Sequence, residues 1–308
     1  MFITFLSDFG LQDDFVGTCH GVIKRITPEA EIIDVTHGIP PQAVLQGALV
    51  LASTLPYMPI GVHLAVVDPG VGGHRRAIAL RDQEGRLFVG PDNGLLLPAA
   101  ERAGVADAHE LVNPVYALES ISRTFHGRDL FAPAAAHLAR GTLIGELGPP
   151  IDPEALVRLD LPEPVFADDV VHATTLYVDS FGNIVLNLTR DDLDRVGVIP
   201  GTRVELDLAG ERYFAVVART FADARTGDVI LYEDSYRNMS IAISSGNAAA
   251  MLHTVVGQAL SIRAARRSPG SSSVPRSPGS STLGAPIRNQ SSSPWISHAT
   301  DRDGDNGH

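Results

Sequence analysis

The chain has 308 residues, of which 44% are hydrophobic and 19% charged, a composition typical of a globular protein long enough for two domains. Its formal net charge of -12 argues against a nucleic-acid or anionic-membrane partner, because either would require a basic face. The single cysteine, Cys19, excludes an internal disulfide and a multi-cysteine zinc site, and it predicts a reducing compartment, the cytoplasm.

The first half of the chain alternates predicted strands with predicted helices. A strand at residues 3–6 begins at once, without the basic segment and cleavage site of a secretory signal, and no apolar run reaches the roughly eighteen residues of a membrane span. A helix to about residue 25, a strand at 31–35, a helix at 42–55 and a strand at 63–67 follow. This order predicts a layered α/β domain with a mostly parallel sheet, residues 1–162.

The strand at 63–67 ends abruptly in Asp68-Pro69-Gly70. Proline cannot continue a strand ladder, so Asp68 should lie at the carboxyl edge of the sheet, where open α/β sheets bind their ligands. Arg75 follows closely enough to reach back and pair with the Asp68 carboxylate. Taken alone, this pattern is more typical of a turn with a solvated salt bridge than of catalysis.

Further polar turns follow in the same domain. Strands at 77–80 and 87–89 are joined by the short turn 81–85, and helices are predicted to about residue 103 and at 130–139. The turns at Asp8, Asp68, Asp92 and His126 could converge at one edge of a parallel sheet. A histidine beside a glycine, such as His126, is by itself more typical of an ordinary loop.

The pattern changes near residue 163, after two proline-rich stretches. Short alternating strands are predicted at 172–178, 184–188, 202–208, 213–217, 228–232 and 239–243. They indicate a smaller antiparallel β-barrel or sandwich domain, residues 163–267. Ser, Pro and Gly make up about half of residues 268–308, which predicts a disordered tail. We find no internal repeats.

Two polar clusters lie in this second region. Asp179, Phe181 and Asn183 follow a strand, either as an Asx turn at a hairpin or as a site that holds an ammonium and stacks on a ring. The second cluster pairs Asp234-Ser235-Tyr236 with the loop Ser244-Ser245-Gly246. No phosphate loop, dinucleotide fingerprint or paired metal-ligand spacing is present, and a metal site built from His37, His126 and aspartates has no support from spacing.

Six motifs occur in one order along residues 2–263: Ser7-Asp8-Phe9-Gly10, VVDPGVGGHRR at 66–76, PDNGLL at 91–96, FHGRDLFAP at 125–133, DSFGN at 179–183, and SIA with GNAA at 240–249. In these motifs the chain resembles the S-adenosyl-L-methionine hydroxide adenosyltransferase family, which also contains the fluorinases and chlorinases. The resemblance implies an enzyme that hydrolyses S-adenosylmethionine to adenosine and methionine, without a metal or cofactor. It also implies a homotrimer in which each site lies between the first domain of one subunit and the second domain of its neighbour.

The family's functional positions can be placed on this chain residue by residue. The resemblance implies a catalytic triad of Asp68, Arg75 and His126. The substrate-binding positions are Asp8 for the ribose hydroxyls, Asp179 for the methionine ammonium, Phe181 and Asn183 around adenine, Ser235 for the methionine carboxylate, and Ser244 and Ser245 where many relatives have an Asn-Gly pair.

The implied mechanism agrees with elementary chemistry. Neutral methionine leaves a sulfonium readily, so the missing component is a nucleophile. Arg75 would bind a water and stabilise it as hydroxide, Asp68 would orient Arg75, and His126 would hold or deprotonate the water.

Three alternatives stay open. A halide adenosyltransferase of the same family is disfavoured because the halogenating relatives carry a long insertion where this chain has the turn 81–85, and because Gly127 occupies the position of the fluoride-pocket serine. A metal-dependent nucleotide phosphatase could use the aspartates. A non-catalytic adenosine- or S-adenosylmethionine-binding module would need the binding residues alone.

Overall fold

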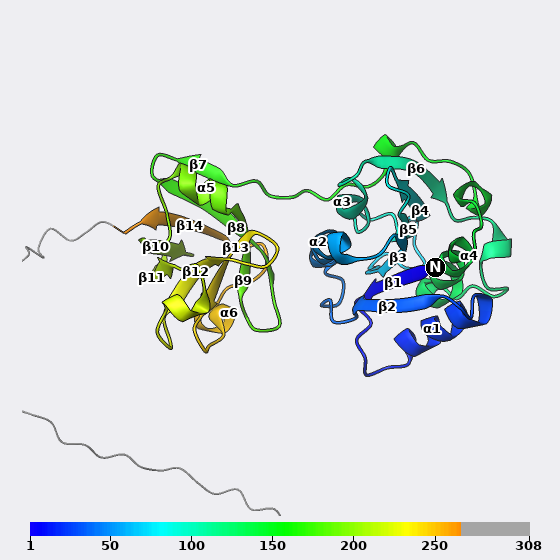
Figure 1. Ribbon diagram of the computed structural model, residues 1–308, viewed down its shortest axis with the longest axis horizontal. Helices are drawn as coiled ribbons and strands as arrows, with labels where there is room; N and C mark the ends of the chain where they lie inside the picture. The colour runs from blue at the N-terminus through cyan, green and yellow to red at the C-terminus, as the bar shows by residue number, and fades with distance from the viewer. Residues whose placement is uncertain (266–308) are drawn as a thin grey trace, which may run out of the picture. The chain divides into compact units, whose positions relative to one another are not determined.

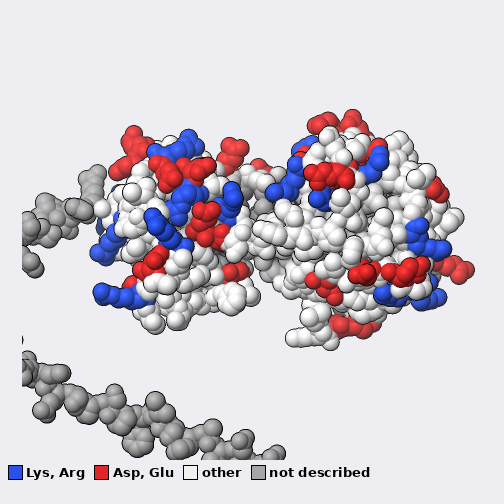
Figure 2. All heavy atoms as spheres, viewed as in Figure 1, with Lys and Arg blue, Asp and Glu red and all other residues white. Residues whose placement is uncertain are grey.

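The computed structural model of the chain describes residues 1–265, and the tail predicted at 268–308 lies outside the described residues (Figure 1). Two separate sheets account for the strands, one from the first 110 residues and one from residues 165–264. No helix within the described part is long and apolar enough to cross a membrane. On the face shown in Figure 2, acidic and basic side chains are interspersed rather than gathered into one basic patch.

The N-terminal sheet has six strands in the order β2-β1-β3-β5-β4-β6. Strands β2, β1, β3 and β5 run parallel, and β4 is antiparallel to both of its neighbours, so the predicted mostly parallel sheet is confirmed. Strand β6 was not predicted. The strands are β1 Phe2–Ser7, β2 Glu31–Thr36, β3 Gly61–Val66, β4 Ala77–Asp82, β5 Leu87–Pro91 and β6 Val105–Glu110.

Helices cover both faces of this sheet, because successive strand residues point to opposite sides. In β3, Val62 and Leu64 pack into the core formed with α1 and α4, while Ala65 packs into the core formed with α2 and α3. The helices are α1 Phe15–Ile26, α2 Val44–Thr54, α3 Leu97–Ala100 and α4 Ala132–Ala139. The helix predicted to reach residue 103 is therefore only four residues long. A π-helical turn, Gly127–Phe131, leads into α4.

The C-terminal sheet closes into a seven-stranded barrel, because β14 pairs with β8 as well as with β10. Strand β7 adds to the outside of β8, and β11–β12 is the parallel exception among antiparallel pairs. Closure leaves these barrel strands without open edges. The elements are β7 Val165–Ala167, β8 Val170–Val178, β9 Ile184–Thr189, α5 Arg190–Arg195, β10 Arg203–Leu208, β11 Glu211–Val217, β12 Val229–Glu233, β13 Asn238–Ile243, α6 Ala248–Met251 and β14 Ala259–Ala264.

The antiparallel barrel predicted for the second region is confirmed, although β7 and β14 were missed. Its core is built from alternate residues of every barrel strand, such as Val204, Leu206 and Leu208 of β10. The boundaries predicted at 162/163 and 267/268 stay predictions.

Candidate active site

The polar turns of the N-terminal sheet meet where parallel strands β1 and β3 end. Ser7 pairs with Val66 in the register of the two strands, and the backbone N–H of Asp8 donates to the Val66 carbonyl at 3.3 Å. Burial raises the pKa of the Asp8 carboxyl, and the nearby Asp68 charge raises it further. The predicted convergence of Asp8 with Asp68 is therefore present.

Arg75 is held from two sides. Its Nε donates to both carboxylate oxygens of Asp68 at 3.0 Å, and its Nη2 donates to Asp68 Oδ2 at 2.5 Å. The same Nη2 lies 2.7 Å from Nδ1 of His126, which is 51 positions further along the chain. The side chains of Arg75 and Asp68 are only 11% and 5% exposed, and the guanidinium lies 5.1 Å from the Phe131 ring centroid. The structure therefore brings the three predicted triad residues into direct contact.

This contact fixes the tautomer of His126. A guanidinium has only donors, so Nδ1 must accept from Arg75 and the ring proton must be on Nε2. Burial, and then the charge of Arg75, lower the pKa of His126, against smaller opposing effects of Asp68, Asp129 and the Ser122 backbone. Neutral His126 thus has its lone pair engaged by Arg75. The geometry suits positioning of the guanidinium better than proton abstraction from a water.

The Arg75 guanidinium has two N–H groups to spare. Nε and Nη2 make all of its hydrogen bonds to described residues, so both Nη1 hydrogens are available for a ligand. A water or hydroxide bound there would face a full positive charge whose counter-ion, Asp68, sits on the opposite side. Such an arrangement stabilises an anion without a metal.

Asp8 is held by a strained neighbour. Its Oδ2 accepts the backbone N–H of Gln42 at 2.9 Å, and Gln42 has a φ of 67°, an uncommon conformation for a residue with a side chain. Strain of this kind persists where the surroundings over-determine it, and it clusters at functional sites. Gln42 donates the only hydrogen bond from another described residue to this side chain, which leaves Oδ1 for a ligand hydroxyl.

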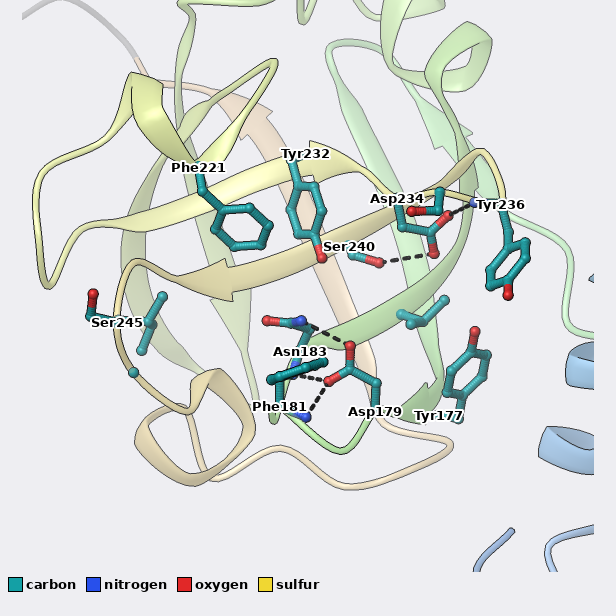
Figure 3. A pocket seen from close by; sticks show the side chains of 14 residues that line it. Tyr177, Asp179, Phe181, Asn183, Phe221, Tyr232, Asp234, Tyr236, Ser240 and Ser245 are labelled. Atoms are coloured by element: carbon teal, nitrogen blue, oxygen red, sulfur yellow. Dashed lines mark hydrogen bonds between the residues drawn. The ribbon is translucent and has the colours of Figure 1, made fainter. Parts of the chain in front are cut away.

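A separate pocket of about 650 Å³ opens in the C-terminal barrel (Figure 3). Five of the predicted binding residues line it: Asp179, Phe181, Asn183, Ser235 and Ser245. Ser244 does not line it; its backbone N–H donates to the Asp228 carbonyl, and its carbonyl accepts from the Gly227 N–H. Sequence reasoning did not assign the other polar and aromatic lining residues: Tyr177, Phe221, Tyr232, Asp234, Tyr236 and Ser240.

The pocket is built from two copies of one turn. Residues 176–183 read Leu-Tyr-Val-Asp-Ser-Phe-Gly-Asn and residues 231–238 read Leu-Tyr-Glu-Asp-Ser-Tyr-Arg-Asn. In the first, Oδ1 of Asp179 accepts the N–H groups of the aromatic residue and the asparagine, both at 2.9 Å. In the second, Oδ1 of Asp234 accepts the equivalent pair at 2.8 and 2.9 Å. The expectation of no internal repeats is therefore wrong, and the repeated octapeptide was the signal that would have matched Asp234, named only as part of a polar cluster, to Asp179.

Both turns place a tyrosine and a carboxylate at the pocket. Burial raises the pKa of Tyr232 to about 12 and that of Tyr177 further, and the nearby carboxylates of Asp179 and Asp234 add to both shifts. The tyrosines therefore stay protonated and can donate. Phe181 is 77% exposed and offers a free aromatic face. Two carboxylates among aromatic rings suit a ligand that carries both a cationic group and a planar ring.

Family models for the N-terminal and C-terminal domains of SAM hydroxide adenosyltransferases match residues 3–148 and 173–261. A relative from Salinispora arenicola, called (R)-S-adenosyl-L-methionine hydrolase, is 47% identical over 263 residues, which cover 85% of this chain and 97% of the relative. The chain belongs to the SAM hydroxide adenosyltransferase family.

Two further relatives and one solved structure are also similar to the chain. A Thermus thermophilus protein, also called (R)-S-adenosyl-L-methionine hydrolase, is 38% identical, with 80% of this chain and 93% of the relative covered. A fluorinase from Nocardia brasiliensis is 30% identical, with 80% and 91% covered. A crystal structure of an uncharacterized conserved protein from Thermotoga maritima matches with a TM-score of 0.79 at 36% identity, over 85% of this chain and 99% of that one. The family resemblance inferred from the motifs is confirmed.

One position beside the triad, Gly127, has no room for a side chain. A Cβ at Gly127 would lie 2.8 Å from Cζ of Phe9 and 3.4 Å from Phe125. Phe9 is itself held by edge-on contacts to Phe5 and Phe125, with ring centroids 6.3 and 5.7 Å apart. A side chain at residue 127 therefore requires the aromatic wall to move.

The described residues contain one group of close metal-ligating side chains: His20, Asp34 and His37. The group does not include His126, so the metal site considered from His37 and His126 together is not formed. Within the described residues, Asp68 and His126 belong to no group of three or more close metal-ligating side chains.

Proposed function

We propose that this protein hydrolyses S-adenosyl-L-methionine to adenosine and L-methionine; several of its relatives are called (R)-S-adenosyl-L-methionine hydrolase. The observation that carries the proposal is Arg75, held between the Asp68 carboxylate and His126 Nδ1 with both Nη1 hydrogens free. The same chain is 47% identical to a protein called an (R)-S-adenosyl-L-methionine hydrolase. We extend the (R) preference of that name to this protein.

The reaction needs a nucleophile more than an acid. When the bond between C5′ and the sulfonium sulfur breaks, the sulfur keeps the bonding electrons and methionine leaves as a neutral thioether. The nucleophile is the limiting component, because hydroxide is scarce at neutral pH. Arg75 stabilises hydroxide relative to water, so the bound water can release its proton to the bulk solvent, and each unit by which Arg75 lowers the pKa of that water corresponds to about 1.4 kcal/mol. Asp68 fixes the guanidinium and His126 positions it, so we infer that no metal or cofactor enters the chemical step.

The binding roles follow the chemistry of each side chain. Asp8 would accept the ribose hydroxyls through Oδ1. In the barrel pocket we assign Asp179 to the ammonium, Phe181 and Asn183 to adenine, and Ser235 to the carboxylate. Ser245 lies at the pocket and is retained, whereas Ser244 does not line it.

The triad lies beside the N-terminal sheet, and the pocket lies in the C-terminal barrel. We propose that a homotrimer brings the triad of one subunit and the pocket of its neighbour to a common site. A mixing experiment tests this. Asp68→Asn chains, which should turn over slowly, and Asp179→Asn chains, which should bind substrate weakly, should recover part of the parental kcat/KM when denatured and refolded together. No recovery, with mixed oligomers present, would contradict a shared site.

We also propose a cytoplasmic location, which cell fractionation would check.

Halide transfer is the second candidate within the family, and the space beside His126 opposes it. A serine at residue 127 would meet Phe9. Incubation with S-adenosylmethionine and excess fluoride or chloride should therefore yield adenosine rather than a halogenated nucleoside.

The test of the main proposal is direct. Purified protein incubated with S-adenosylmethionine should produce adenosine and methionine in equal amounts, both with and without a chelator. Binding without products would favour a non-catalytic module, and loss of turnover with the chelator would favour a metal-dependent enzyme. Either result overturns the proposal.

A further inference from the structure

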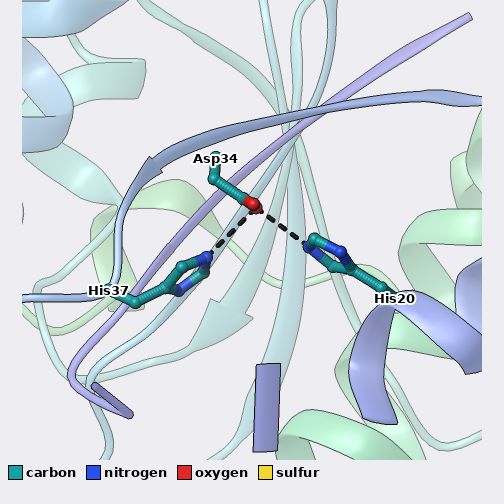
Figure 4. Close-up of side chains that lie close together, drawn as sticks. All are labelled: His20, Asp34 and His37. Carbon is teal, nitrogen blue, oxygen red and sulfur yellow. Dashed lines mark hydrogen bonds and ion pairs between the residues drawn. The ribbon is translucent and has the colours of Figure 1, made fainter. Parts of the chain in front are cut away.

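A cluster of two histidines and one carboxylate lies on the α1 side of the N-terminal sheet, outside the proposed reaction (Figure 4). His20 comes from helix α1, Asp34 from strand β2 and His37 from the loop after β2. His20 Nε2 lies 2.9 Å from Asp34 Oδ1, and His37 Nε2 lies 3.1 Å from the same oxygen. One ligand atom from each residue lies within 4.8 Å of the others.

One of these atoms lacks a hydrogen bond. His37 is only 4% exposed, and its Nε2 has no hydrogen-bond partner among the described residues although Asp34 Oδ1 is close. The pair is thus near but poorly aligned for N–H donation. A buried imidazole nitrogen without a partner is costly unless something else occupies its lone pair.

The other ring nitrogen of His37 is already engaged. Its Nδ1 lies 2.7 Å from the hydroxyl oxygen of Ser7, which is fully buried. When Nδ1–H donates to that oxygen, the Nε2 lone pair points toward the carboxylate, and a cation between them removes the repulsion. Metal-binding histidines are oriented in this way by a hydrogen bond at the opposite nitrogen.

The spacing of the atoms fits a first-row transition metal. With metal–ligand bonds of about 2.1 Å, ligands at right angles are about 3.0 Å apart and ligands at tetrahedral angles about 3.4 Å. Both distances to Asp34 Oδ1 lie close to the first value. Two imidazoles and one carboxylate are ligands for Zn²⁺, Fe²⁺ or Co²⁺ rather than for Mg²⁺ or Ca²⁺. The Asp34 side chain is 41% exposed, so water can complete the coordination.

We propose that His20, Asp34 and His37 form a binding site for a divalent transition metal ion that joins helix α1 to the end of strand β2. The ion takes no part in the hydrolytic step. Its connection to the site runs through the loop that carries Asp8. The His37 carbonyl accepts from Gly10 N at 2.8 Å, and the His37 ring contacts Ser7, the residue before Asp8. The ion would therefore hold the segment 7–10 in place.

Binding can be measured without turnover. Metal-free protein is titrated with Zn²⁺ by calorimetry and with Co²⁺ by visible absorption. We expect saturable binding of one ion per chain. At a free metal concentration about 100 times Kd, the ratio of folded to unfolded protein should rise about 100-fold.

Variants localise the site. His20→Gln and Asp34→Asn each remove a ligand at a partly exposed position and should abolish stoichiometric binding, whereas Ser7→Ala should weaken it about 10- to 100-fold. His172→Gln, at an exposed histidine of strand β8, is the matched control and should bind as the parent does. Circular dichroism checks that each variant is folded. Absence of saturable binding in the parent, or undiminished affinity in the folded His20→Gln and Asp34→Asn variants, would overturn the proposal.

Discussion

The triad at the edge of the N-terminal sheet and the pocket of the C-terminal barrel are built in opposite ways. Asp68, Arg75 and His126 depend on one another, and the closing contact joins residues 51 positions apart. In the barrel, each aspartate is held by its own turn, within four residues. The first arrangement is nearly buried and charged, while the second exposes an aromatic ring. We therefore expect changes in the triad to act on turnover and changes in the pocket to act on binding.

The largest expected effect comes from Arg75→Lys. An ammonium cannot contact Asp68 twice, reach His126 and still present two N–H groups to water. We expect kcat to fall about 100- to 1000-fold, the typical cost of losing a donor to the reacting oxygen. Steady-state kinetics measures it. Arg76→Lys is the matched control, because Arg76 forms a similar pair with Asp92 and should keep the parental kcat. Equal losses in both variants would contradict a specific role for Arg75.

The second effect separates positioning by His126 from a purely structural role. Only neutral His126 can accept from Arg75, and burial lowers its pKa below the ordinary 6.5. Turnover should therefore be constant near neutral pH and fall as the pH decreases, with a midpoint below 6.5. In His126→Gln, whose side-chain carbonyl can also accept, this acid limb should disappear and kcat should fall about 10- to 100-fold. A parental pH profile in the variant would assign the titration to another group.

The third effect lies in the pocket. Asp179→Asn removes a charge that faces the ligand but keeps an acceptor for the turn, so KM should rise about 10- to 100-fold with little change in kcat. Asp234→Asn makes the same change in the second copy of the turn. If only one of the two raises KM, that residue holds the ammonium. If neither does, the pocket is not the methionine site.

The smallest effect compares the left-handed residues of the two turns. Gly182 has a φ of 82°, and a Cβ there would lie 2.2 Å from Asn247 Cγ, so Gly182→Ala should cost about 1–3 kcal/mol of unfolding free energy. Arg237 has a φ of 70° in the second turn, and Arg237→Gly should change stability by less than about 1 kcal/mol. Urea denaturation measures both. A loss in Gly182→Ala no larger than a gain in Arg237→Gly would show that backbone conformation, rather than contact with Asn247, requires glycine.

The features that sequence predicted best depend on local or repeated chemistry. The hydrophobic runs of β1, β3 and β9 identified their strands, and the turn at Asp179 is the Asx turn that its residues suggested. Strand β6 reads Val-Ala-Asp-Ala-His-Glu and becomes a strand only by pairing with β4, so its own pattern was too polar to find. Strand β7 has three residues, too few for a period.

The candidate site shows the same division. Motifs identified Asp68, Arg75 and His126, but the tertiary fold decides which nitrogen of His126 contacts Arg75. That contact changes the role inferred for His126 from holding or deprotonating the water to positioning the guanidinium. Asp234 was named in a polar cluster but was given no binding role, for a different reason. It lies in the second copy of a turn whose first copy had already been assigned, and the repetition becomes visible only when the two stretches are aligned.

The close approach of Phe9 to residue 127 has a consequence for how this chain could change over evolutionary time. A substitution that adds bulk at 127 meets a ring contributed by a turn near the start of the chain, so its effect depends on which residue already stands at position 9. A smaller residue there would have to come first, or the two changes would have to arise together. The contact between Phe9 and residue 127 therefore determines the order in which substitutions at these two positions could be accepted.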